Sequence, residues 1–145
     1  MPLSTARATS LLSLLAYPAG ALSLALGPDA PGTVITGYAL IAGSLVCYVP
    51  LATSWLQRIV AEQPSKLDEY ELHLRSRAMN AAYIGYTALV LLAVIYAAIA
   101  SDAGAWVPKT YDGFNGLFWG AFLYAVVLPL ACLSWMLDST ADPAA

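Results

Sequence analysis

The residues of this sequence that are suited to acid–base chemistry lie in one short segment. The segment holds three carboxylates and the only histidine of the chain: Asp68, Glu69, Glu71 and His73. Carboxylates beside an imidazole can move protons in an active site. The same segment, 66–77, carries six of the charged residues of a chain that has only 6 Lys and Arg and 9 Asp and Glu, whereas residues 78–101 carry none. The segment is therefore the first place to look for a function.

The spacing within this segment is that of an ordinary charged helix surface. Ser65 stands three residues before Asp68, which is a near match to a capping box and predicts a helix start at Ser65. Glu71 and Arg75 are four residues apart in the order that stabilises a helix. Elsewhere, the apolar runs contain no carboxylate pair, Ser-His-Asp set or metal-binding cluster. We therefore expect no enzyme, no catalytic residue, no metal and no cofactor.

The elements that position this segment are long apolar runs. Hydrophobic residues make up 60% of the chain and charged residues 10%, against about a quarter in a soluble domain. Four runs are long enough to cross a bilayer, and we expect spans at about 9–27, 33–57, 77–101 and 113–137. Backbone groups in lipid must bond within the chain, which requires helices. The prediction is a single-domain, all-α membrane protein with four transmembrane helices in an up-down bundle.

The first and third runs each leave a question about the ends of a span. The first run also has the order of parts of a cleavable signal peptide, so its retention is open. The third helix has no strong breaker before its span, so we expect a cytoplasmic helical extension over 65–77. Arg75 and Arg77 in this extension are expected to contact lipid headgroups.

The extension has two competing interpretations. Leu67, Tyr70 and Leu74 recur at helical spacing and predict one apolar face, with His73 beside it. This face could bind a cytoplasmic protein partner. Alternatively, the extension is only a solvated anchor that sets the depth of the helix.

The distribution of basic residues predicts the orientation. Five of the six basic residues lie at the end that holds the middle loop, and only Lys109 lies at the other. The positive-inside rule then places the middle loop and both termini in the cytoplasm, in a bacterial inner membrane. Six basic residues form no stripe for nucleic acid. The expected partners are the lipid bilayer and a protein.

Small residues at four-residue spacing predict close helix packing. Gly116 and Gly120 in the fourth run have this spacing, and Gly113 extends the pair along the same face; Ala39 and Gly43 form a similar pair in the second run. Small residues allow helix backbones to approach closely in lipid. The spacing leaves open whether these contacts lie within the molecule or in a homo-oligomer.

The charged segment also carries a resemblance. The residues Leu67-Asp68-Glu69, Glu71, and Arg75, Arg77 and Ala78 form an LDExE segment followed by RxRA. This pattern resembles that of small, uncharacterised bacterial four-helix inner-membrane proteins. Some of these resemble membrane partners encoded beside helix-turn-helix regulators, which implies that a transcription factor is held at the membrane.

Together these patterns favour a non-enzymatic inner-membrane protein that contacts another protein in an accessory or regulatory role. The absence of ionisable residues from the span centres disfavours an ion-coupled pump acting alone. A subunit of an oligomeric membrane transporter or channel is the alternative. A small lipid-modifying enzyme is a weaker third hypothesis, because only the segment 66–77 offers reactive groups.

Overall fold

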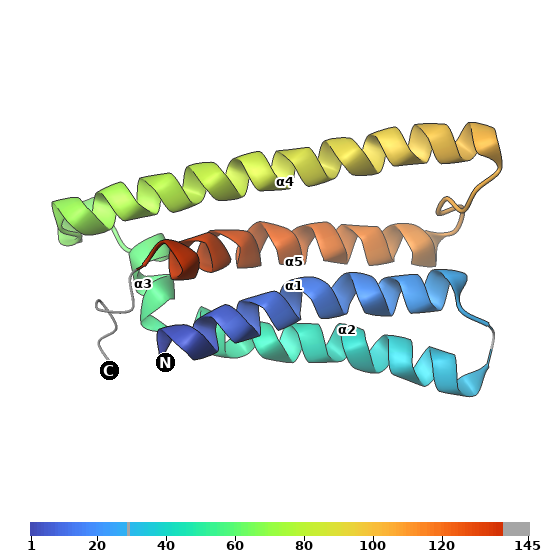
Figure 1. Ribbon diagram of the computed structural model, residues 1–145, viewed down its shortest axis with the longest axis horizontal. Helices are drawn as coiled ribbons and strands as arrows, with labels where there is room; N and C mark the ends of the chain where they lie inside the picture. Colours follow the sequence, from blue (N-terminus) through green and yellow to red (C-terminus); the bar gives the residue numbers. More distant parts are fainter. Residues whose placement is uncertain (29, 138–145) are drawn as a thin grey trace.

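The computed structural model describes residues 1–28 and 30–137, without the side-chain surroundings of residues 112 and 113. All regular structure in these residues is helical (Figure 1). The helices are α1 (Leu3–Leu26), α2 (Pro31–Ala52), α3 (Trp55–Ala61), the 3-10 turn η1 (Pro64–Lys66), α4 (Glu69–Ala103) and α5 (Tyr111–Met136). Four of them, α1, α2, α4 and α5, are long and apolar enough to cross a membrane. The predicted all-α membrane fold is confirmed.

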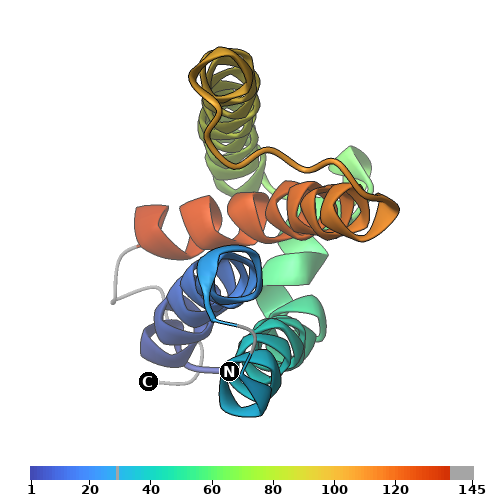
Figure 2. The same ribbon diagram turned by 90° about the vertical axis from the view of Figure 1, so that its right-hand side faces the viewer.

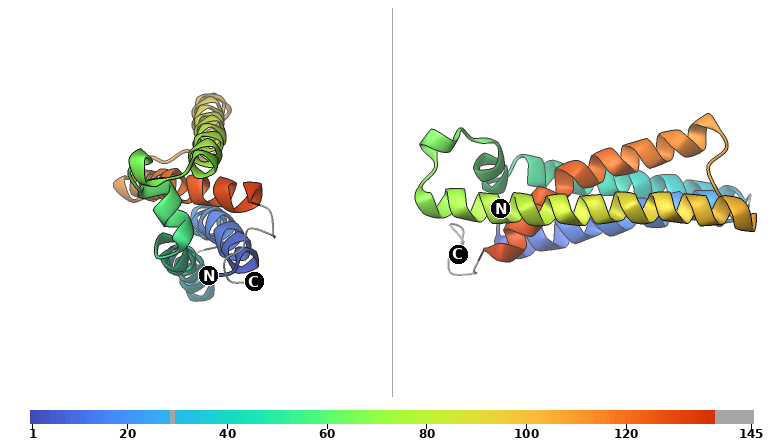
Figure 3. Two further views of the ribbon diagram at one scale, coloured as in Figure 1. Left: turned by 90° about the vertical axis from the view of Figure 1, so that its left-hand side faces the viewer. Right: turned by 90° about the horizontal axis from the view of Figure 1, so that it is seen from above.

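The four long helices alternate in direction and form an incomplete bundle. Helices α1 and α2 pack along their length, and α5 lies across α1 (Figure 2). Helix α4 stands outside this group and packs mainly on α5, which crosses it at an angle when seen from above (Figure 3). The crossing keeps the two helices together near α3 only. As a result, all residues of α4 over 88–99 are exposed.

Helices α1 and α2 approach each other through a pair of glycines. A Cβ atom at Gly20 would lie 2.7 Å from the carbonyl oxygen of Gly37, and one at Gly37 would lie 2.6 Å from the side chain of Leu24. The pair predicted in α2, Ala39 and Gly43, does not contact α1. No atom lies within 4 Å of a Cβ at Gly43, and Ala39 is exposed. That prediction was wrong for packing within the molecule, because the i, i+4 spacing recurs on more than one face of α2.

A proline in α1 is compensated by a tyrosine of α5. Pro18 has no N–H, so the carbonyl of Leu14 loses its helical partner. The hydroxyl of Tyr124 donates to that carbonyl oxygen at 2.5 Å. A second bond between helices runs from the Ser13 hydroxyl to the carbonyl of Ser44, at 2.9 Å. These bonds supply partners where lipid offers none.

The second membrane helix ends earlier than the predicted 33–57. Helix α2 stops at Ala52, and a separate helix, α3, begins at Trp55. Two features favour the break: Pro50 cannot donate a backbone hydrogen bond, and the Ser54 hydroxyl donates to the carbonyl of Leu51 at 2.7 Å. The sequence did not predict α3 as an element.

The extension of the third membrane helix is confirmed as helical from Glu69, but its predicted start at Ser65 is wrong. Residues Pro64–Lys66 form a 3-10 turn, and Asp68 is the N-cap of α4. The carboxylate of Asp68 accepts from the N–H of Glu71 at 2.6 Å, and the Glu71 side chain accepts in turn from the N–H of Asp68. The capping box is therefore shifted by one turn, since Asp at the N-cap and Glu three residues later satisfy both exposed donors.

Candidate functional site

The charged segment lies at one end of the bundle, which we call the α3 end. The α3 end comprises α3, η1 and the start of α4, with the N-terminus beside them (Figures 1 and 3). An apolar cluster joins these parts: Leu56, Ile59, Leu74, Ala78 and Leu137 belong to it. The indole N–H of Trp55 donates to the carbonyl of Met1 at 3.3 Å. The α3 end is therefore a packed cap on the bundle.

Polar contacts brace the start of α4 against α3. Arg58 of α3 forms an ion pair with Glu71 of α4. The guanidinium of Arg75 donates to the backbone carbonyl of Glu62 at 2.7 Å, and the Glu62 carboxylate lies 3.4 Å from the ammonium of Lys66. Each exposed ion pair adds little stability alone. Together with the capping box, they hold the first turns of α4 in one orientation.

Arg7 links the first and last helices at this end. Its Nε donates to the carbonyl of Ser134 at 3.0 Å and its Nη2 to that of Leu137 at 2.7 Å. Its guanidinium also lies 5.2 Å from the ring centroid of Trp135. These carbonyls lie at the C-terminus of α5, where the helix provides no further N–H and where positive charge is favoured.

Two of the four acid–base residues of the segment already have structural partners. Asp68 caps α4, and Glu71 pairs with Arg58. Glu69 and His73 are exposed. Within 1–28 and 30–137, no three residues of the types His, Cys, Asp and Glu lie close enough to hold a metal ion. The geometry of the segment is therefore that of a braced helix start.

The structure separates the three residues of the predicted partner-binding face. Leu67 and Leu74 are only 8% and 5% exposed, whereas Tyr70 is 58% exposed. Leu67 precedes the helix, and Leu74 lies in the apolar cluster with α3. The single apolar face was a wrong prediction, because it assumed a helix from 65 and no neighbour such as α3.

A different set of residues is exposed on α4. We call it the exposed face, and its members are Tyr70, His73, Ser76, Arg77 and Asn80. They lie on one side of the helix, beside the stripe of Leu74, Ala78 and Ala82, which are buried. The two predicted headgroup residues differ: Arg77 belongs to this face, whereas Arg75 is partly buried and bonded to Glu62.

The small residues of α5 are used within the molecule at one position. A Cβ atom at Gly120 would lie 2.7 Å from the ring of Tyr17, so only glycine leaves room for that ring. The Tyr17 hydroxyl donates to the carbonyl of Gly116 at 2.6 Å, yet no atom lies within 4 Å of a Cβ at Gly116. The surroundings of Gly113 lie outside those that the structure describes.

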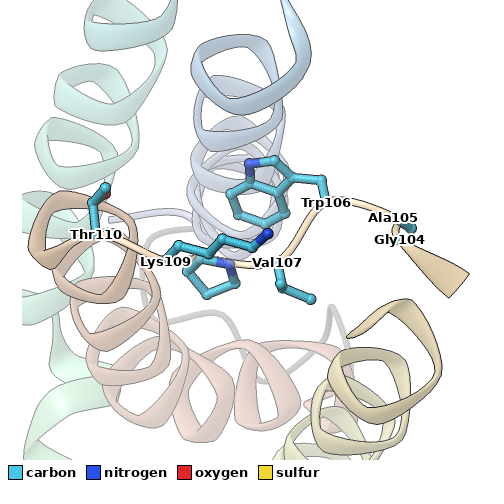
Figure 4. Close-up of a pocket in the computed structure, with 7 residues that line it drawn as sticks. Gly104, Ala105, Trp106, Val107, Lys109 and Thr110 are labelled. Carbon is cyan, nitrogen blue, oxygen red and sulfur yellow. The ribbon is translucent and has the colours of Figure 1, made fainter. Parts of the chain in front are cut away.

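Two hollows lie away from the charged segment. One, of about 410 Å³, is formed by the connection 104–110, where Trp106, Val107 and Lys109 gather while Thr110 lies apart (Figure 4). All of its lining comes from one short connection. The other, of about 190 Å³, lies between α4 and α5 and is mostly apolar, with Tyr83 and Tyr86 on one side and Pro129 on the other. Neither hollow brings together groups for a reaction.

Taken together, four candidate spans and the α3 cap define a multi-pass, all-α membrane protein. Comparisons of the chain with protein-family models, with curated proteins and with solved structures found no match.

Proposed function

We propose that this protein is a non-enzymatic component of a bacterial inner membrane that holds a protein partner at the cytoplasmic surface through the start of α4. The α3 end carries five basic residues: Arg7, Arg58, Lys66, Arg75 and Arg77. The opposite end carries Lys109. This asymmetry supports a cytoplasmic α3 end and cytoplasmic termini under the positive-inside rule.

The observation that carries the proposal is the position of Tyr70. Its side chain is 58% exposed in the first turn of α4. It lies seven residues before Arg77, which is about 10 Å along the helix axis in the direction away from the apolar part of α4. An aromatic ring in water, beyond lipid, is the type of residue that anchors protein interfaces.

The bracing of α4 supports the same proposal. The capping box at Asp68, the ion pair of Glu71 with Arg58 and the bond of Arg75 to Glu62 orient Tyr70 before any partner binds. A surface that is already ordered loses less conformational entropy on binding.

The residues beside Tyr70 are polar, so the partner surface is mixed. Glu69 and His73 lie exposed on adjacent turns. Of the predicted partner-binding residues, Tyr70 and His73 remain in the proposal as contacts, and Leu67 and Leu74 as supports below them. Exchanging either leucine for Asp would disturb the cap itself, so neither change isolates binding.

Affinity purification in mild detergent tests the proposal with a matched pair of exposed tyrosines. Tyr70→Ala is expected to abolish recovery of the partner, whereas Tyr111→Ala, at an 80% exposed tyrosine that starts α5, is expected to retain it. Recovery of the same partner by both variants, or no partner with the unaltered chain, would contradict the proposal.

The alternative function is a subunit of an oligomeric transporter or channel. The specific observation in its favour is α4, whose residues over 88–99 are exposed on every side and are available to a neighbouring helix. Solute flux into liposomes that is abolished by Gly116→Leu would support the alternative. That substitution is made at a position where no atom lies within 4 Å of an added Cβ.

A further inference from the structure

The exposed face of α4 contains three neighbouring polar side chains without a partner: Ser76, Arg77 and Asn80. Across 1–28 and 30–137, none of them makes a hydrogen bond or an ion pair. Several hydroxyls in the membrane helices instead bond to a carbonyl of their own helix. Ser10, for example, donates to the carbonyl of Arg7, and Ser44 to that of Ile41. The three side chains are therefore free to donate to a group outside the chain.

Arg77 is the basic residue of the α3 end that has no partner within the described part of the chain. The other four are engaged with groups of the chain itself: Arg7, Arg58, Lys66 and Arg75. The exposed carboxylate of Glu69, in the first turn of α4, is eight residues from Arg77, or about 12 Å along the axis. The positive charge of Arg77 is thus not neutralised locally.

The depth of the three side chains follows from the length of α4. The uncharged part that ends at Ser101, before the charged Asp102, needs about 20 residues to cross a hydrocarbon core of about 30 Å. Counting back from Ser101 places the other boundary near Ala81, directly after Asn80. At the same level, Ala78 belongs to the apolar cluster that includes Leu137, just beyond the end of α5.

We propose that Ser76, Arg77 and Asn80 bind the phosphodiester group of an anionic phospholipid. All three side chains can donate hydrogen bonds, and a phosphate accepts them. The guanidinium of Arg77 offers two parallel donors to the phosphate oxygens. An anionic lipid is favoured over a zwitterionic one, because this part of the exposed face carries no carboxylate to complement a choline or ethanolamine group. The proposal is independent of any protein partner at Tyr70.

Native mass spectrometry of the full chain with added lipid tests the site. The unaltered protein is expected to bind phosphatidylglycerol in preference to phosphatidylcholine of the same chain length. Arg77→Gln is expected to weaken phosphatidylglycerol binding about fivefold or more, as one basic residue near an anionic surface contributes. Arg75→Gln and Lys109→Gln make the same charge change and are expected to alter it less than twofold.

Further variants separate the proposed contacts from net charge and from folding. Asn80→Leu keeps every charge, yet it is expected to weaken phosphatidylglycerol binding, and it serves as the test if Arg77→Gln does not fold. Equal affinity for the two lipids, or equal losses in Arg77→Gln and Lys109→Gln, would overturn the site. Displacement of the lipid by millimolar inorganic phosphate would assign it to free phosphate and would also overturn the lipid proposal.

Discussion

The hydroxyl of Tyr124 in α5 donates a 2.5 Å hydrogen bond to the carbonyl oxygen of Leu14 in α1, the carbonyl that Pro18 leaves without a helical donor. The bond joins residues 110 positions apart and fastens α5 to α1 at the proline. It shows how this bundle tolerates a proline in lipid: a side chain of a neighbouring helix replaces the lost N–H.

Removing this hydroxyl should weaken the bundle. Tyr124→Phe is expected to lower the free energy of unfolding by about 0.6 to 1.7 kcal/mol, the range measured for hydrogen bonds between membrane helices. Unfolding in detergent mixtures measures it. Tyr83→Phe is the control, because Tyr83 is exposed and makes no hydrogen bond in the described residues. Equal stability of the two variants would show that Leu14 needs no partner.

Two glycines of the first hairpin should respond oppositely to alanine. Gly20→Ala places a Cβ 2.7 Å from the backbone oxygen of Gly37, and backbone cannot move aside without separating the helices. We expect a loss of about 1 to 3 kcal/mol in unfolding free energy. Gly43→Ala meets no atom within 4 Å and should be neutral or stabilising, since alanine is the better helix former. Thermal denaturation of both variants in one detergent distinguishes them.

Arg7 should contribute to the stability of the fold as well as to its orientation in the membrane. Arg7→Gln removes a charged donor from the carbonyls of Ser134 and Leu137, and we expect a cost of about 1.5 to 3 kcal/mol. Arg7→Lys keeps the charge but not the two-pronged geometry, so it should restore only part of the loss. Denaturant unfolding gives the values, and full rescue by lysine would exclude the proposed geometry.

The start of α4 can be tested at its cap. Asp68→Ala should destabilise the first turns of α4 by about 0.5 to 2 kcal/mol, because the N–H of Glu71 loses its acceptor. Ser65→Ala should have no such effect, since Ser65 lies in η1 and caps nothing. Hydrogen exchange at the amide of Glu71 reports the difference. Faster exchange in Ser65→Ala would instead favour the helix start that the sequence alone predicted.

The proposed orientation has a direct chemical test. In a background without Cys47 and Cys132, Ser65→Cys at the α3 end should resist an impermeant maleimide in intact cells and react in inverted vesicles. Lys109→Cys should show the reverse pattern. Both positions are exposed, so access to the reagent depends on the side of the membrane. Labelling of Ser65→Cys in intact cells would show that the α3 end faces outward and would contradict the proposed orientation.

The properties that the sequence determined by itself are those that depend on local composition. Uncharged runs predicted the helical membrane fold, because backbone groups in lipid must bond within the protein and a helix pairs almost all of its own. The charged segment before the third apolar run was correctly predicted to be helical and continuous with that run. Its start was misplaced by one turn, since Ser65 and Asp68 are both good caps and only the fold of the preceding loop selects between them.

Only the tertiary structure decided which residues are exposed and which have partners. Leu74 became buried because α3 folds against it, and no local pattern predicted α3. Arg75 was engaged and Arg77 was left exposed by the position of Glu62, 13 residues away from Arg75. The glycine contact formed at Gly20 and Gly37 instead of at a better-spaced pair. Each outcome depends on the distance between residues far apart in the chain, which composition and periodicity do not contain.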